Sequence, residues 1–214
     1  MRIMIAIPCM DMMHSDFVIS LTGLRHEGNV RYVYSVSSLV YDSRNGLARR
    51  AIVEGFDRVL WLDSDMKFSA DLLERLNADL DEGRDLVSGL YVTRKPPFKP
   101  CIFKECGYKH KDGDREVRPY ADSYYDYPKD SIFEIDACGF GGVLMQTSLL
   151  KAVESKYGLP FAPMLGFGED ISFCLRAKDL GAKMYCDSRI KLGHVGFYTY
   201  TEDNYLEIAK NGKL

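Results

Sequence analysis

The sequence predicts an α/β fold in a single domain, with a mixed, mainly parallel central sheet that helices flank. Two short apolar runs, at residues 2–7 and 58–62, are typical of buried strands. Residues 42–55 lie between them and repeat apolar side chains at helical spacing. A strand, a helix and a strand in quick succession favour parallel pairing. The 214 residues, 46% of them hydrophobic, are enough for one substantial core.

Local signals mark the ends of the first elements. Pro8 ends the strand at residues 2–7, because proline cannot continue a central ladder. An alternating run at residues 30–36 predicts a second, more exposed strand. Asp42 or Ser43 can cap the helix that follows it.

The same kinds of signal recur to residue 186, with one interruption. We expect helices at residues 69–83, 147–158 and 169–181, and strands at residues 85–92, 133–138 and 182–186. Residues 94–131 are rich in Gly, Pro, Asp, Lys and Tyr, which indicates a long inserted loop of the functional kind. We therefore expect one domain over residues 1–196 and a C-terminal tail over residues 197–214. Arg94, Lys95 and Lys99 form a basic turn that either contacts phosphate or is simply solvated.

Two carboxylates, Asp63 and Asp65, come directly after the strand at residues 58–62. In open α/β sheets, ligands bind at this carboxyl edge. If the backbone stays extended, residues two apart project to the same side and the two acids converge. A hard divalent cation, Mg²⁺ or Mn²⁺, that also binds phosphate oxygens would relieve their repulsion. The alternative is a solvated turn, because Asp and Ser are ordinary turn residues.

Three more chemical groups fall on loops or at element ends. Glu169 and Asp170 open the predicted helix at residues 169–181, and His194 lies between two glycines. A cation site plus a separate carboxylate suits the transfer of a group from a diphosphate, with the carboxylate accepting a proton from the attacking hydroxyl. Taken singly, the two acids fit the positive end of a helix dipole, and His194 fits a loop histidine that donates to a carbonyl.

Composition disfavours several other classes of protein. The 28 basic and 31 acidic residues give a net charge of -3, which argues against nucleic-acid binding as the main activity. No apolar run reaches the roughly 18 to 20 residues that span a bilayer, and the apolar N-terminus is too short for a signal peptide, so we expect a soluble, cytoplasmic protein. Six irregularly spaced cysteines favour reduced thiols. Cys101, Cys106 and His110 lack a local fourth ligand for zinc.

The order of these pieces resembles that of family 2 glycosyltransferases with the GT-A fold. The matching segments span residues 2–196 and are Ile7-Pro8, Ser43-Arg44-Asn45, Leu62-Asp63-Ser64-Asp65, Asp136-Ala137-Cys138-Gly139-Phe140-Gly141-Gly142 and Gly168-Glu169-Asp170. The resemblance implies a Rossmann-like sheet that binds a nucleotide-diphosphate sugar of the UDP or GDP type. It also implies transfer of the sugar to a glycan or another hydroxyl acceptor, with inversion.

The resemblance implies roles for particular residues as well. The residues implied to bind the nucleotide sugar are Pro8, Arg44, Asp63, Gly141 and Glu169. Asp65, helped by Asp63 and His194, would hold Mn²⁺ or Mg²⁺, and Asp170 would be the general base. The run after Pro8 is Cys9-Met10-Asp11-Met12-Met13 where the family has a Thr-Tyr-Asn-like run, so the family's contacts to the nucleobase do not transfer to this loop.

Two other classes of function stay open. A non-catalytic nucleotide-sugar or glycan-binding module would use the same acids for metal but would not need Asp170 as a base. An aspartate-dependent phosphatase or phosphotransferase also uses a strand-end aspartate. Its Asp-x-Asp-x-Thr/Val pattern belongs near the N-terminus, whereas here the motif lies well into the chain and Lys67 stands second after Asp65.

Overall fold

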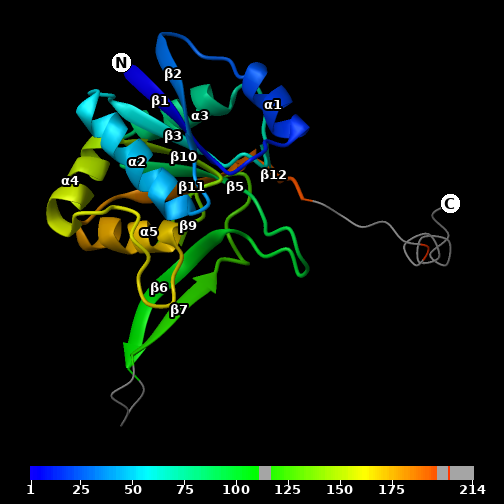
Figure 1. Ribbon diagram of the computed structural model, residues 1–214. Helices are drawn as coiled ribbons and strands as arrows, with labels where there is room; N and C mark the ends of the chain where they lie inside the picture. The colour runs from blue at the N-terminus through cyan, green and yellow to red at the C-terminus, as the bar shows by residue number, and fades with distance from the viewer. Residues whose placement is uncertain (111–116, 197–201, 203–214) are drawn as a thin grey trace.

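The computed structural model describes residues 1–110, 117–196 and 202 (Figure 1). The strands are β1 (Arg2–Cys9), β2 (Asn29–Val36), β3 (Arg58–Leu62), β4 (Met66–Lys67), β5 (Leu86–Leu90), β6 (Ile102–His110), β7 (Val117–Ser123), β8 (Ile132–Glu134), β9 (Ala137–Cys138), β10 (Gly142–Gln146), β11 (Met184–Lys191) and β12 (Gly193–His194). The helices are α1 (Ser15–Thr22), α2 (Val40–Val53), α3 (Leu72–Asp81), α4 (Thr147–Tyr157) and α5 (Glu169–Asp179).

The central sheet has seven strands in the order β2-β1-β3-β10-β5-β11-β8. β1 is parallel to both β2 and β3, so that Ile5 lies opposite Tyr32 on one side and Leu60 on the other. β5 and β11 are also parallel, whereas β10 and β8 run antiparallel to their neighbours. The predicted fold class, a mixed, mainly parallel sheet flanked by helices, is confirmed.

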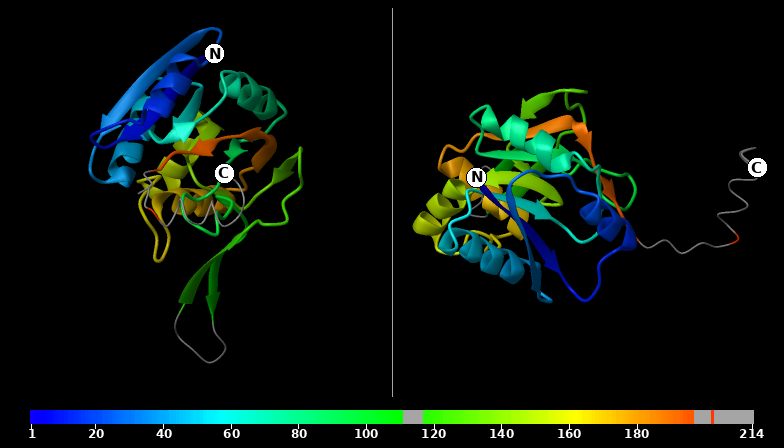
Figure 2. Two further views of the ribbon diagram at one scale, coloured as in Figure 1. Left: turned by 90° about the vertical axis from the view of Figure 1, so that its right-hand side faces the viewer. Right: turned by 90° about the horizontal axis from the view of Figure 1, so that it is seen from above.

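Apolar side chains on the two faces of the sheet form two cores. Along β1, Met4 and Ala6 belong to the core under α2, α4 and α5, while Ile3, Ile5 and Ile7 belong to the core under α1 and α3. Successive strand residues point to opposite faces, so a strand that is apolar at every position must be covered on both. Figure 2 shows helices on both sides of the sheet.

The inserted segment at residues 94–131 contains regular structure where the sequence suggested a loop. β6 and β7 form an antiparallel hairpin, with Cys106 opposite Ala121, and it projects from the body of the molecule (Figure 1). β9 pairs with β6 to make a small three-stranded sheet.

The strand predicted at residues 133–138 is divided between two sheets. β8 joins the central sheet and β9 joins the small one. The chain crosses between them at Ile135, whose amide donates to the Met184 carbonyl, and at Asp136, whose amide donates to the Phe103 carbonyl. The backbone hydrogen bonds of this short segment are thus satisfied by two different partners.

Helix α2 begins at Val40, before the two residues predicted to cap it. Its N-cap position is Leu39, which makes no capping hydrogen bond through its side chain. Ser43 is buried, and its hydroxyl donates to the Ser35 carbonyl on β2 at 3.4 Å. Ser43 therefore fastens the helix to the sheet and does not cap it.

A small ribbon completes the edge of the sheet at which the parallel strands end. β4 pairs with β12, so that His194 lies opposite Met66, and the Val195 amide donates to the Asp65 carbonyl at 2.7 Å. Residues near the end of the described chain are thereby brought to the turn that follows β3. None of the helices in the described residues has the length and apolar character needed to cross a membrane.

Candidate active site

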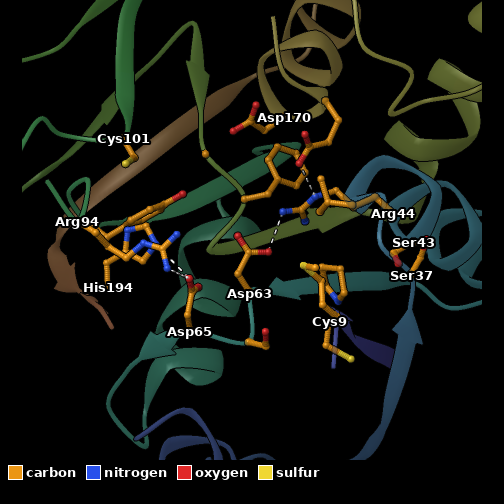
Figure 3. Close-up of a pocket in the computed structure, with 18 of the residues that line it drawn as sticks. Cys9, Ser37, Ser43, Arg44, Asp63, Asp65, Arg94, Cys101, Asp170 and His194 are labelled. Atoms are coloured by element: carbon orange, nitrogen blue, oxygen red, sulfur yellow. Dashed lines mark hydrogen bonds and ion pairs between the residues drawn. The ribbon is translucent and has the colours of Figure 1, made fainter. Parts of the chain in front are cut away.

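A cavity of about 450 Å³ opens where β1, β2, β3 and β5 end (Figure 3). Seven of the predicted site residues line it: Pro8, Arg44, Asp63, Asp65, Glu169, Asp170 and His194. They come from strand ends and the turn after β3, from the second turn of α2, from the first turn of α5, and from β12. This is the edge at which open α/β sheets bind ligands.

Arg44 lies at the back of this cavity and is the most enclosed of its charged groups. Only 2% of its side chain is exposed. Its Nη2 donates to Asp63 Oδ1 at 2.8 Å and its Nε donates to Glu169 Oε1 at 3.1 Å. The guanidinium also lies over the rings of Trp61 and Phe140, at 5.7 and 5.3 Å from their centroids. A buried cation with two carboxylates and two aromatic faces fixes the position of both acids.

Asp63 and Asp65 do not converge on one point. The strand ends at Leu62, and the Met66 amide donates to the Asp63 carbonyl at 3.2 Å, which closes a turn. This turn ends the extended backbone that would have aligned the two side chains. Asp63 instead binds Arg44, and Asp65 faces His194 and Arg94 (Figure 3).

Asp65 faces two basic side chains through a single oxygen atom. Arg94 Nη1 lies 2.9 Å from Asp65 Oδ2, and His194 Nε2 lies 3.5 Å from the same atom. Burial favours a raised pKa for Asp65, but the hydrogen bond from His194 and the charges of His194 and Arg94 outweigh it and hold the pKa below its ordinary value. Asp65 is therefore a carboxylate over the whole physiological range.

The orientation of His194 is set by its other ring nitrogen. Nδ1 lies 2.9 Å from the Val92 carbonyl oxygen, which can only accept, so Nδ1 is the donor. The hydrogen bond with Asp65 raises the pKa of His194 although burial opposes this shift. The hydrogen bond to Asp65 is made by the protonated ring; when His194 is neutral, Nε2 carries no proton and its lone pair faces Asp65 Oδ2. Two ligands of one small cation at about 2.1 Å each lie about 3 to 3.4 Å apart, so the 3.5 Å separation fits a shared Mn²⁺ or Mg²⁺.

Asp63 is not gathered with the other two predicted metal ligands. Within the described ranges, no three His, Cys, Asp or Glu side chains converge as a ready metal cluster. A cation held by Asp65 and His194 would have its remaining positions filled by phosphate oxygens and water, as is common for Mg²⁺ beside substrate phosphates.

Asp170 lies in the first turn of α5, on the other side of Asp63 from Asp65 (Figure 3). Burial, together with the charge of the neighbouring Glu169, raises the pKa of Asp170 to about 6. The loop before α5 is held by Ser172, whose hydroxyl donates to the Gly168 carbonyl at 2.6 Å and accepts from the Met164 amide at 2.8 Å. A carboxyl group with this pKa is suited to exchange protons near neutral pH.

The glycine turn after β9 approaches the protein's own side chains closely. A Cβ atom on Gly139 would lie 2.0 Å from the Tyr91 hydroxyl, and one on Gly141 would lie 2.9 Å from the Met66 sulfur. Gly141, a predicted binding residue, is buried beneath the cavity and outside its lining, and its amide donates to the Tyr91 hydroxyl at 3.2 Å. Gly139 lines the cavity instead.

Sequence reasoning missed several residues of the cavity wall. Tyr91 follows β5 and its ring lies edge-on to His194, with centroids 5.4 Å apart. Cys101 and Phe103 come from the beginning of the inserted segment, and Ser37 follows β2. Ser37 and Tyr91 both follow a strand that ends at this edge, and that position was the one signal available for them.

Comparison with solved structures identifies the fold. The chain is similar to A197 from STIV, with a TM-score of 0.67 and 19% identity over 92% of this chain and 87% of that one. It is similar to residues 1-349 of TarS from S. aureus, with a TM-score of 0.57 and 16% identity over 91% of this chain and 60% of that one. GalNAc-T7, solved with UDP, GalNAc and Mn²⁺, gives a TM-score of 0.51 and 13% identity over 91% of this chain and 38% of that one.

These likenesses define the chain as a protein with the GT-A fold of glycosyltransferases. The predicted resemblance to glycosyltransferases is thereby confirmed at the level of the fold. No protein-family model and no curated protein matches the sequence. The chain spans 60% of the TarS 1-349 chain and 38% of the GalNAc-T7 chain.

Proposed function

We propose that this protein is a metal-dependent glycosyltransferase that moves a sugar from a nucleotide-diphosphate sugar of the UDP or GDP type to a hydroxyl acceptor, with inversion. One observation supports this most strongly. The Asp65–His194 pair and a separate carboxyl group, Asp170, lie in the same cavity at the carboxyl edge of a GT-A sheet. GalNAc-T7, which has the same fold, was solved with UDP, GalNAc and Mn²⁺.

The part of the cavity nearest β1 and β2 has the chemistry of a nucleoside site. Pro8, Met10 and Val40 offer apolar contacts, and the hydroxyls of Ser37 and Ser43 lie on the same wall. Small-molecule sites usually combine an apolar lining with a few polar groups that fix orientation. Arg44 keeps Asp63 and Glu169 in place behind this wall.

The diphosphate would lie beside Asp65 and His194. Mn²⁺ or Mg²⁺ bound there would neutralise the negative charge that develops on the departing diphosphate. His194 is held for this role by its hydrogen bond to the Val92 carbonyl, and a second group that orients a histidine is the normal arrangement at metal sites.

Asp170 would act as the general base. The acceptor oxygen forms a bond to the anomeric carbon, the bond from that carbon to the diphosphate oxygen breaks, and the acceptor's proton goes to Asp170. With a pKa of about 6, Asp170 is largely ionised at pH 7 and can accept this proton. Attack from the face opposite to the leaving diphosphate inverts the anomeric centre.

Calorimetric titration tests the donor site. We expect one of UDP, GDP and dTDP to bind in the presence of Mn²⁺ and to lose most of its affinity when a chelator replaces the metal. Asp65→Ala should abolish the part of the affinity that depends on metal. The control is Asp11→Ala, which removes an exposed acid outside the cavity lining. An Asp65 variant that binds the nucleotide as tightly as the unaltered protein in Mn²⁺, and loses the same affinity when a chelator is added, would remove Asp65 from the site.

A further inference from the structure

Arg94 occupies the position at Asp65 that a bound cation would need. Its Nη1 is 2.9 Å from Oδ2, the oxygen that also faces His194 Nε2. A guanidinium and a divalent cation cannot share one carboxylate oxygen at this distance without strong repulsion between like charges. Arg94 therefore has to leave Asp65 when a metal ion binds there.

The side chain of Arg94 is held by fewer contacts than that of Arg44 in the same cavity. It is 48% exposed, whereas Arg44 is 2% exposed and bound to two carboxylates. Within the described ranges, Arg94 forms its ion pair with Asp65. One ion pair with a half-exposed arginine is weak, so little is lost when it breaks.

The backbone that bears Arg94 is fixed, so the motion is limited to the side chain. The Thr93 amide donates to the Lys99 carbonyl at 2.9 Å, and the Lys99 amide donates to the Thr93 hydroxyl at 3.0 Å. The stem of Arg94 packs against Gly196, where a Cβ atom would lie 2.9 Å from Arg94 Cδ. A change of partner by Arg94 therefore needs only rotation of the outer part of its side chain.

From this arrangement we infer that Arg94 is an exchangeable counter-ion, which neutralises Asp65 in the empty site and moves to the donor diphosphate when the metal ion takes its place. The inference rests on the proposed function. A planar guanidinium matches two phosphate oxygens at once, so the diphosphate offers Arg94 a better partner than a single carboxylate oxygen. Arg94 thus opposes the metal alone and favours metal and nucleotide together, which makes their binding mutually dependent.

The two effects of Arg94 have opposite signs, and this makes them measurable. In Arg94→Gln, we expect Mn²⁺ alone to bind about tenfold more tightly, as followed by electron paramagnetic resonance of free Mn²⁺. With Mn²⁺ saturating, we expect the preferred nucleoside diphosphate to bind about tenfold more weakly by calorimetry. Arg94→Lys should restore most of the competition with Mn²⁺ but only part of the affinity for the diphosphate.

Lys95→Gln is the matched control, because Lys95 is exposed in the same turn and does not line the cavity. It should leave both affinities unchanged. An Arg94→Gln variant with the Mn²⁺ affinity of this control would overturn the exchange, and so would tighter Mn²⁺ binding with undiminished nucleotide affinity. If the unaltered protein binds no nucleoside diphosphate with Mn²⁺, the proposed function fails and this inference fails with it. If the unaltered protein binds a nucleoside diphosphate with Mn²⁺ but the Arg94 variant behaves like the Lys95 control, only the inference about Arg94 fails and the proposed function stands.

Discussion

Arg44 determines the positions of two of the acids around the cavity. Its guanidinium is shared between Asp63 on the turn after β3 and Glu169 at the beginning of α5. Burial of the guanidinium favours a lower pKa, but the charges of Asp63 and Glu169 outweigh it and raise the pKa of Arg44. Arg44 is therefore always charged, and its removal leaves two carboxylates without their counter-ion.

We expect Arg44→Met to lower the free energy of unfolding by about 3 kcal/mol, as for the loss of one partner from a buried ion pair. Urea denaturation followed by circular dichroism measures this. Arg94→Gln, which removes a half-exposed arginine from the same cavity, should change stability by less than about 0.5 kcal/mol. Equal stability of the two variants would show that Arg44 does not organise the site.

The pKa of Asp170 predicts the pH dependence of activity. Burial and the charge of Glu169 raise this pKa to about 6, and a general base works only when ionised. We therefore expect kcat/KM to fall about tenfold per pH unit below pH 6 and to level off above it. Glu169→Gln removes the neighbouring negative charge, so the acidic limb of the pH profile should move to lower pH. An acidic limb that stays in place would mean that another group limits the rate.

The individual site residues were predictable from the sequence only where they stood next to a strand end or a helix start. Asp63, Asp65 and Asp170 could be found in this way. Their partners could not, because the pairing of Arg44 with Asp63 depends on how α2 packs over β1 and β2. The contact between Arg94 and Asp65 likewise depends on β10 lying between β3 and β5, which spacing along the chain does not reveal.

At the scale of the elements, two neighbouring acids, Asp79 on α3 and Asp187 on β11, lie where these elements pack together, away from the cavity. Asp79 on α3 is buried, and this burial together with the adjacent Asp187 on β11 raises the pKa of Asp79 to about 6. Burial also favours a raised pKa for Asp187, but the hydrogen bonds from Arg189 outweigh it and lower the pKa. One proton shared between the two acids therefore belongs mainly to Asp79.

This acid pair predicts how stability depends on pH. Between the ordinary pKa of 3.8 and the folded value of about 6, folded Asp79 binds a proton that the unfolded chain does not. Its contribution to stability is therefore fully present below pH 3.8 and is lost as the pH rises through 6. Asp79→Asn should remove this loss, so the melting temperature of the variant, relative to that of the unaltered protein, should be higher at pH 7 than at pH 5. A parallel pH profile in the variant and the unaltered protein would contradict this.

Helix α1 and the hairpin of β6 and β7 are among the elements that escaped prediction, because their local signals are weak. Helix α1 has eight residues and includes the β-branched Val18 and Ile19, and its N-cap residue, His14, makes no capping hydrogen bond through its side chain. Such a helix forms by packing rather than by propensity. The segment that forms β6 and β7 is rich in turn-forming residues, so its sequence predicts a loop. By contrast, continuous apolar runs identified β1 and β3 correctly.

At the scale of the whole molecule, the sheet topology brings the predicted site residues together in one cavity. Pro8 and His194 stand near opposite ends of the described chain, yet both line one cavity because β1, β3 and β5 end on the same edge and β12 folds back onto β4. The GT-A fold could be predicted from the sequence, because the resemblance rests on the order of short motifs along the chain. The donor, the acceptor and the partners of each acid depend on the cavity's shape, which needs the folded chain.

The most direct test of the central claim is release of nucleoside diphosphate from a nucleotide-diphosphate sugar. Purified protein with Mn²⁺ would be incubated with UDP- and GDP-linked hexoses, with water or a simple glycoside as the acceptor, and the products separated by anion-exchange chromatography. We expect release by the unaltered protein, none with a chelator, and a loss of about 10²-fold or more in Asp170→Asn with donor affinity retained. Asp11→Asn should behave as the unaltered protein does. Tight donor binding without release in any of these proteins would instead indicate a binding module, and equal release by Asp170→Asn would remove Asp170 from the chemistry.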